Sequence, residues 1–208
     1  MNENNVLAVI LAGGKSKRFG RDKANVMLGD KTILEHVIDK IQKIYSEILV
    51  ISNNDKLKFS KKNIFIASDC IKGHLGPLVG VLSAMKWVKQ NNRKYNWIST
   101  FPCDTPFFDE KIIEELEKKL NKTQKQLVFL KSGERRHNIF GLWSLNLMNV
   151  LEEDIKNNFR KVEDWANKIG SEIINIESNN FDNFLNINTE EDYKNAKKNL
   201  EKIKNDFV

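Results

Sequence analysis

The stretch VLAVILAGGKSKRFGRDK, residues 6–23, decides how the chain begins to fold. Its first six residues are apolar, which predicts a buried strand over Val6–Leu11. Three glycines follow, and they let the backbone turn tightly and pass close to a ligand. Backbone N–H groups in such a loop can surround phosphate oxygens, and the same stretch carries five cations: Lys15, Lys17, Arg18, Arg21 and Lys23. The sequence therefore predicts a loop that binds the triphosphate of a nucleotide.

The spacing of these glycines excludes two common phosphate-binding loops. A P-loop requires a glycine five residues before its Gly-Lys-Ser, and Val9 stands at that distance from Gly14-Lys15-Ser16. A dinucleotide fingerprint requires G-x-G-x-x-G, which Gly13-Gly14 does not supply. The loop therefore belongs to another kind of nucleotide-binding site.

Apolar runs at 48–51, 64–67 and 97–101 predict three more strands. Helical patterns separate them at 32–45, where Thr32 and Glu35 form a capping box, and from Pro77 to about residue 87. This alternation predicts an α/β fold with an open, mostly parallel, Rossmann-like sheet and helices on both faces. Ligands of such sheets bind beyond the carboxyl ends of the strands. Besides the glycine-rich loop, the residues expected at that edge are Ser52, Asn53, Asn54, Asp69 and Asp104.

The second half of the chain is less regular. A turn at 131–134 between strands 127–130 and 138–143 predicts a small hairpin added to the sheet. Helices are expected at 112–120 with Asp109 as cap, at 145–155 and at 162–169, and a strand at 172–176. A last helix begins at Thr189, and its face of Tyr193, Ala196, Leu200 and Ile203 is expected to pack on the core. We expect one domain over 1–208, with a nucleotide-binding half over about 1–108 and an acceptor-binding half over about 109–208.

The composition is that of an ordinary soluble globular protein. The 208 residues are 40% hydrophobic and 30% charged, with a net charge of +6. The lysines are spread along the chain without a run of five or six like charges, so solvated helix faces explain them better than nucleic-acid binding. The two cysteines stand in no zinc spacing, and no apolar run is long enough for a membrane span. We expect a cytoplasmic protein that binds neither a membrane nor nucleic acid.

The glycine-rich segment resembles the L-A-G-G-x-S-x-R-M-G-x-D-K signature of the molybdenum cofactor guanylyltransferase family, which is MobA-like. Phe19 replaces the methionine, and the other fixed positions agree. Three later segments, at 76–80, 102–106 and 186–189, are similar to the family's G-P-L-x-G, P-C-D-x-P and N-x-N-T elements. The departures are Glu190 in place of proline, His137-Asn138 in place of His-Pro, and Ser52 where the family often has asparagine.

The resemblance implies a nucleotide-diphospho-sugar transferase type of fold and transfer of GMP from GTP to molybdenum-molybdopterin, with release of pyrophosphate. Asp104 is the candidate Mg²⁺ ligand because a carboxylate oxygen at the ligand edge suits that ion, and Arg18 and Lys23 are the candidate transition-state cations. The candidate nucleotide contacts are Leu11, Ala12, Gly13, Gly14, Lys23, Ser52, Asp69 and Asp104. The candidate acceptor contacts are Gly76, Gly80, Arg136, Asn186 and Asn188, with Arg135 and His137 beside them. The partners would be these two substrates, with transient contact to cofactor-synthesis or molybdoenzyme-maturation proteins.

Three other functions stay open on the sequence alone. A CTP-dependent cytidylyltransferase for molybdopterin or for a sugar or alcohol phosphate would use the same fold. A nucleotide sensor would keep the loop and lack turnover. A basic RNA-binding protein is disfavoured because Asp69 and Asp104 are expected at the ligand edge. His36 and His74 belong to no motif, and Cys103 has no histidine beside it in sequence that would make it a nucleophile.

Lys23→Ala is expected to lower kcat/KM for the nucleotide on the order of a hundredfold, because the ammonium would neutralise charge that develops on a phosphoryl oxygen. Steady-state pyrophosphate release measures this loss. An unchanged kcat/KM would remove Lys23 from the mechanism.

Overall fold

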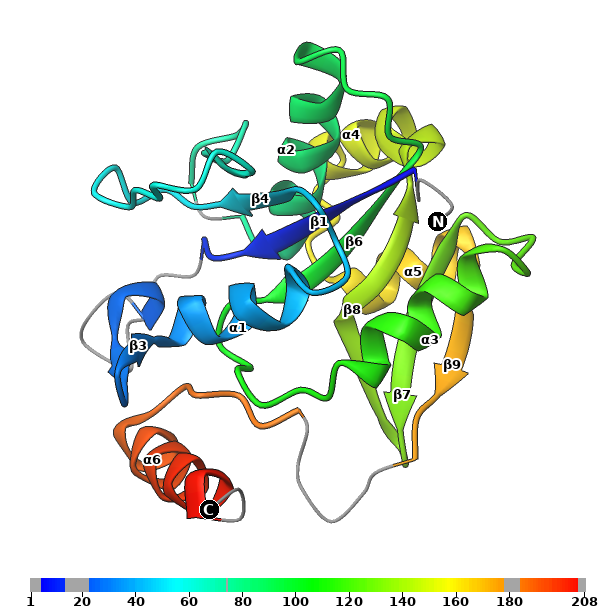
Figure 1. The fold of residues 1–208 in the computed structure, drawn as a ribbon. Coiled ribbons are helices and arrows are strands. Elements are labelled where there is room, and N and C mark those ends of the chain that lie inside the picture. The colour runs from blue at the N-terminus through cyan, green and yellow to red at the C-terminus, as the bar shows by residue number, and fades with distance from the viewer. Residues whose placement is uncertain (1–4, 14–22, 74, 178–183, 206–208) are drawn as a thin grey trace.

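The computed structural model describes residues 5–13, 23–73, 75–177 and 184–205. Its centre is a seven-stranded sheet in the order β5-β4-β1-β6-β8-β7-β9 (Figure 1). The strands are β1 (Val6–Leu11), β4 (Ile48–Ile51), β5 (Ile64–Ala67), β6 (Trp97–Pro102), β7 (Leu127–Ser132), β8 (Arg135–Ser144) and β9 (Glu172–Asn175). Every strand runs in one direction except β8, which is antiparallel to both of its neighbours. The open, mostly parallel sheet predicted from the sequence is confirmed.

Helices cover both faces of the sheet, as the alternation of apolar runs predicted. On one face, α1 (Ile33–Ile41) and α3 (Lys111–Leu120) pack against residues such as Ile10, Val50 and Phe101. On the other face, α2 (Pro77–Gln90), α4 (Met148–Lys156) and α5 (Val162–Ile169) pack against residues such as Val9 and Trp143. The sheet is thus buried on both sides, which is why its central strands are apolar runs and do not alternate.

The C-terminal helix α6 (Glu190–Asn205) packs on a smaller cluster. This cluster includes Leu28 of the short hairpin β2 (Met27–Leu28) and β3 (Lys31–Thr32), with Val26 and Ile33 on either side of that hairpin. The hairpin follows the one-turn helix η1 (Lys23–Asn25). Ala196 is buried in this cluster, and Tyr193 and Leu200 pack against it. The predicted apolar face of the last helix is therefore confirmed for these three residues, while the side chain of Ile203 lies outside the described part.

Several element ends differ from the predictions. Helix α1 ends at Ile41, not at residue 45, and Ile44 is 36% exposed because the chain already turns there toward β4. Asp109 does accept a hydrogen bond from the Lys111 N–H (2.9 Å), although the residue at the cap position of α3 is Glu110. The one-turn helix η2 (Leu145–Leu147) precedes α4, where a single helix was expected.

The hairpin of the second half is an internal part of the sheet. Strand β7 ends at Ser132 and strand β8 begins at Arg135, so the turn between them consists of Gly133 and Glu134 and not of the four residues predicted. Strand β8 then pairs with β6 and separates it from β7. Because β8 is antiparallel to β6, its first residues, which include the candidate acceptor contact Arg136, lie next to the carboxyl ends of the parallel strands.

Close contact between β7 and β8 requires glycine at position 141. A Cβ atom added there would lie 2.5 Å from the Val128 carbonyl oxygen and 2.5 Å from the Phe129 ring. Between Phe129 and Leu130 the register of the two strands shifts, so residues 138–140 of β8 have no partner on β7. Gly141 thus marks the end of a bulge.

Gly141→Ala is expected to destabilise the protein by about 3 kcal/mol, because a fully packed neighbourhood cannot absorb the extra methyl group. Urea denaturation measures the free energy of unfolding. Gly133→Ala is the control, since nothing lies within 4 Å of the added atom and only the left-handed backbone costs about 1 kcal/mol. Equal losses for the two variants would contradict the close contact at position 141.

Candidate functional site

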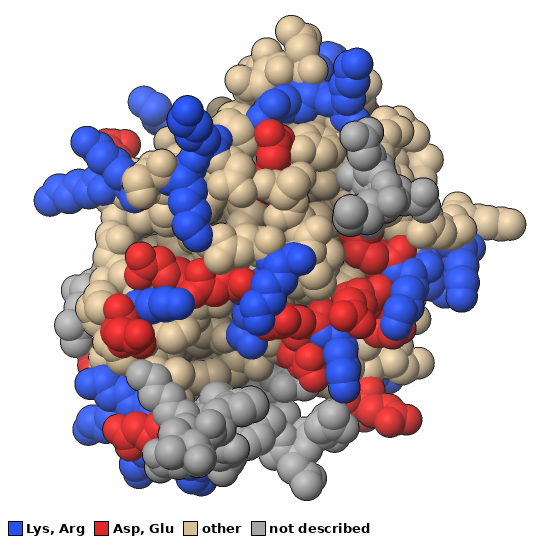
Figure 2. Space-filling model, viewed as in Figure 1, with Lys and Arg blue, Asp and Glu red and all other residues tan. Residues whose placement is uncertain are grey.

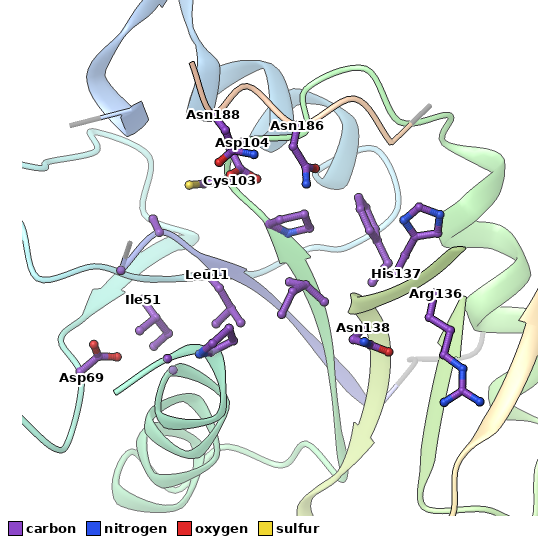
Figure 3. A pocket seen from close by; sticks show the side chains of 18 of the residues that line it. Leu11, Ile51, Asp69, Cys103, Asp104, Arg136, His137, Asn138, Asn186 and Asn188 are labelled. Atoms are coloured by element: carbon purple, nitrogen blue, oxygen red, sulfur yellow. The ribbon is translucent and has the colours of Figure 1, made fainter. Parts of the chain in front are cut away.

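A cavity of about 710 Å³ opens at the carboxyl ends of the parallel strands (Figure 3). This volume suits a ligand of nucleotide size. The walls come from the ends of β1 and β4, the start of α2, the segment after β6, the bulged part of β8 and the chain before α6. The lining residues are Leu11, Ala12, Gly13, Ile51, Asp69, Gly76, Pro77, Gly80, Pro102, Cys103, Asp104, Arg135, Arg136, His137, Asn138, Ile139, Phe140, Asn186 and Asn188.

Asp69 is held against the backbone of the glycine-rich segment. Its carboxylate accepts a hydrogen bond from the Asn53 side-chain NH₂ (2.7 Å), and its backbone N–H donates to the Asn53 side-chain oxygen (3.0 Å). A Cβ atom on Gly13 would lie 3.4 Å from the Asp69 carboxylate. The reciprocal bonds with Asn53 therefore fix the carboxylate on this side of the cavity, within reach of a ligand that lies along Gly13.

Helix α2 begins at the same side of the cavity. Gly76, at its N-cap, has φ +94°, a left-handed conformation that favours glycine, and Pro77 occupies the first turn. Gly80 lets the helix approach β1, because a Cβ atom there would lie 3.1 Å from the Leu11 side chain and 3.9 Å from the Asp69 carboxylate. The structure thus places Gly80 on the same side of the cavity as Asp69. Asp69 is a candidate nucleotide contact, whereas the sequence predicts Gly80 as an acceptor contact.

Asp104 lies after β6, and the chain before α6 is bound to it. The Ile187 N–H donates to the Asp104 carbonyl oxygen (2.8 Å). The Thr105 hydroxyl donates to the Asn186 side-chain oxygen (2.6 Å) and lies 3.4 Å from the Asp104 carboxylate. These bonds bring Asn186 and Asn188 beside Asp104 (Figure 3). Two side-chain amides from the segment before α6 therefore lie next to the carboxylate that follows β6.

Strand β8 supplies the opposite side of the cavity. The Arg136 guanidinium donates to the Asn167 side-chain oxygen of α5 (3.1 Å) and lies 4.0 Å from the Glu163 carboxylate. His137 is buried and stacks on Phe184, with 3.5 Å between ring centroids. Its Nε2 lies 2.7 Å from the Ser132 hydroxyl oxygen. Helix α5 and Phe184 therefore fix the positions of these two candidate acceptor residues.

The cavity brings together most of the candidate nucleotide and acceptor contacts that lie in the described ranges, but Ser52, Asn53 and Asn54, expected at the same edge, are not among its lining residues. Ser52 does not line it: the residue is 3% exposed, and its hydroxyl accepts the Asn54 N–H (3.2 Å). The reason is that the Ser52 N–H continues the ladder to Ala67 (2.9 Å), so the next residue, Asn53, carries the side chain that reaches Asp69. Gly14 and Arg18 lie outside the described residues, as does the side chain of Lys23.

Sequence reasoning missed several lining residues. Ile51, Pro77, Ile139 and Phe140 are apolar and carried no signal apart from their neighbours. Asn138 appeared only as a departure from the family pattern. Cys103 also lines the cavity. The His36 ring lies 2.7 Å from the Leu28 carbonyl oxygen and stabilises the hairpin β2–β3, while His74 lies outside the described residues.

The distribution of charged side chains bears on the alternative of an RNA-binding protein. On the face shown in Figure 2, acidic side chains lie among the basic ones, whereas an RNA groove would gather basic residues. No helix in the described ranges is long and apolar enough to cross a membrane.

The fold and the cavity define an α/β protein with a ligand site at the carboxyl edge of its sheet. Residues 8–168 match the MobA-like NTP transferase domain, and the chain belongs to that family.

Relatives of known name agree with this assignment. The molybdenum cofactor guanylyltransferase of Haemophilus influenzae is 31% identical over 91% of this chain and 96% of its own length. The enzyme of the same name from Nitrobacter hamburgensis is 30% identical over 91% and 92%. The crystal structure of molybdopterin-guanine dinucleotide biosynthesis protein A from Archaeoglobus fulgidus superposes with a TM-score of 0.76 at 22% identity, covering 94% of this chain and 99% of that one.

Asn53→Ala is expected to raise the KM for the nucleoside triphosphate about tenfold, because a hydrogen bond to a charged group is worth about 1.5–3 kcal/mol and Asp69 would lose its fixed position. Asn63→Ala is the control, since it removes a side-chain hydrogen bond of the same β4–β5 connection, to the Ser46 carbonyl oxygen, that does not involve Asp69. Equal KM values for the two variants would show that Asn53 does not position Asp69 for the nucleotide.

Proposed function

We propose that this protein transfers GMP from GTP to molybdenum-molybdopterin and releases pyrophosphate, forming the guanine dinucleotide cofactor. The observation that carries the proposal is one cavity that joins the glycine-rich nucleotide side, at Gly13 and Asp69, to a second side built by β8. The relatives named above carry the name of this activity. A reaction between two bound substrates requires such a shared cavity.

The chemistry needs little from protein side chains beyond position and charge. A terminal phosphate oxygen of the acceptor, already ionised at neutral pH, attacks the α-phosphorus of GTP. The new phosphorus–oxygen bond forms as the bond to the β-phosphate oxygen breaks, and the electron pair leaves with pyrophosphate. Because no proton has to be removed from the nucleophile, a general base is unnecessary, and the protein contributes orientation and neutralisation of charge.

Asp104 is the residue proposed to hold Mg²⁺. The described residues contain no group of three or more histidine, cysteine, aspartate or glutamate side chains that could hold a metal. One carboxylate beside the amides of Asn186 and Asn188 fits an ion that takes its remaining ligands from the triphosphate and water, as Mg²⁺ usually does. When bound, the ion would neutralise charge on the phosphate oxygens.

The remaining roles divide between the two sides of the cavity. We assign the nucleotide to Leu11, Ala12, Gly13 and Gly80, with Asp69 accepting hydrogen bonds from the base or the ribose. The acceptor is assigned to the side of Arg136, whose guanidinium suits an anionic substrate. Lys23 and Arg18 are proposed as the cations that stabilise the transition state.

We also propose that the chain works as one domain in the cytoplasm. Residues 1–108 would serve the nucleotide and residues 109–208 the acceptor, which agrees with a single sheet that contains strands of both halves. Transient contacts with cofactor-synthesis or molybdoenzyme-maturation proteins would deliver the substrate and receive the product.

Asp104→Asn is expected to lower Mg²⁺-dependent pyrophosphate release from GTP and molybdopterin by at least about a hundredfold, because it removes the negative charge that binds the ion. Circular dichroism should show an intact fold. Asp109→Asn is the control: this carboxylate bonds the Lys111 N–H and does not line the cavity, so turnover should stay normal. Near-normal turnover by Asp104→Asn would exclude the proposed role.

A further inference from the structure

The hydroxyl of Thr105 lies where the segment after β6 meets the chain before α6. Thr105 is fully buried and does not itself line the cavity. Its hydroxyl oxygen lies 2.6 Å from the Asn186 side-chain oxygen and 3.4 Å from the Asp104 carboxylate. A hydroxyl has one hydrogen to donate, and the shorter distance directs that hydrogen to Asn186. A buried hydroxyl is therefore satisfied through a side chain that does line the cavity.

The backbone around Asn186 is held by contacts that do not use this hydroxyl. The Ile187 N–H donates to the Asp104 carbonyl oxygen (2.8 Å), and the Asn188 N–H donates to the Asp192 carboxylate (2.9 Å). Before Asn186, the Phe184 ring stacks on His137. The segment thus keeps its place without the Thr105 hydroxyl, whose bond determines only how the Asn186 amide is turned.

The orientation of this amide decides what it offers to a ligand. An asparagine amide accepts through its oxygen and donates two hydrogens through its nitrogen. Because Thr105 occupies the oxygen, the nitrogen remains for a ligand. Among the described residues that nitrogen donates to no protein atom, and it is not enclosed. Figure 3 shows the Asn186 side chain between Asp104 and His137, with its nitrogen directed toward the cavity.

A hydrogen-bond donor at this place suits an anionic oxygen. Asn186 lies beside Asp104, the proposed Mg²⁺ ligand, and toward β8, where the acceptor is assigned. The acceptor phosphate has to come from that side to reach the α-phosphorus of the nucleotide. If the amide were turned the other way, its oxygen would face the phosphate and repel it. The Thr105 hydroxyl therefore sets which end of the amide dipole meets the anion.

We propose that Thr105 is a positioning residue for the transfer: its hydroxyl turns the Asn186 amide so that the NH₂ group donates to the terminal phosphate of the acceptor. This inference rests on the proposed function, because it takes molybdopterin as the second substrate. It also means that the Asn186 oxygen is bonded to Thr105 and not offered to Mg²⁺.

Thr105→Val tests the assignment, since valine keeps the size and branching of the side chain and removes the hydroxyl. The KM for molybdopterin should rise about tenfold, because a hydrogen bond to a charged group is no longer held in place, while the KM for GTP should stay unchanged. Thr105→Ser keeps the hydroxyl and should stay close to the wild-type KM. Thr105→Ala takes the place of the valine variant if circular dichroism shows that the latter does not fold.

A double-mutant cycle with Asn186→Ala shows whether Thr105 acts through Asn186. Calorimetric titration of molybdopterin into the protein, with a non-hydrolysable GTP analogue, measures affinity without turnover. Asn186→Ala alone should weaken binding at least about tenfold. Adding Thr105→Val to it should cause no further loss, because no amide is left to orient. Losses that add in the double variant would overturn the proposed role.

Thr123→Val is the matched control. It removes a threonine hydroxyl that also donates to a side chain of a distant segment, Glu172, and neither residue lines the cavity. Both KM values should stay unchanged in this variant.

The failure of this inference differs from the failure of the proposed function. With an active wild-type protein, unchanged molybdopterin affinity in Thr105→Val would overturn the role of Thr105 alone. An equal loss of GTP and molybdopterin affinity would overturn it too, because the effect would not be confined to the acceptor. A wild-type protein that binds GTP and forms no dinucleotide would instead overturn the proposed function.

Discussion

The parallel pairing of β1 with β4 and β6 is the constraint on which the site depends. The pairing continues one residue beyond the end of β1: the Ala12 N–H donates to the Ile51 carbonyl oxygen (2.8 Å), and the Cys103 N–H donates to that of Leu11 (3.3 Å). The carboxyl ends of β1, β4 and β6 therefore lie side by side at the same edge of the sheet. The segments that follow them carry Gly13, Asn53 and Asp104, so residues distant in sequence meet at one edge of the sheet.

The second half of the chain completes this edge through a reversal of direction. Because β8 is antiparallel to β6, it carries Arg136 and Asn138 back to the carboxyl ends of the parallel strands. The chain before α6 returns to the same place and is bound to Asp104 through the Ile187 N–H. The cavity thus has walls from both halves of the chain, one for each substrate in the proposed function, and the proposed metal ligand lies on a segment bound to both halves.

Local patterns in the sequence were enough to predict the strands of the first half and their common edge. Each strand there is an apolar run that ends in polar residues, and parallel strands bring such ends together. A shift of one residue reverses the direction of a side chain in a strand, which is why Ser52 was predicted in the site and Asn53 is found beside Asp69. The bulge at Asn138 could not be predicted, since it depends on Thr100 and on the close approach of Gly141 to Phe129.

The most direct test of guanylyl transfer is to incubate the protein with Mg²⁺, molybdenum-loaded molybdopterin and each nucleoside triphosphate labelled at its α-phosphate. The account predicts that label from GTP enters a molybdopterin dinucleotide while unlabelled pyrophosphate is released, and that CTP gives little product. Label transferred from CTP in preference to GTP, or binding of GTP with no transfer to molybdopterin, would contradict it.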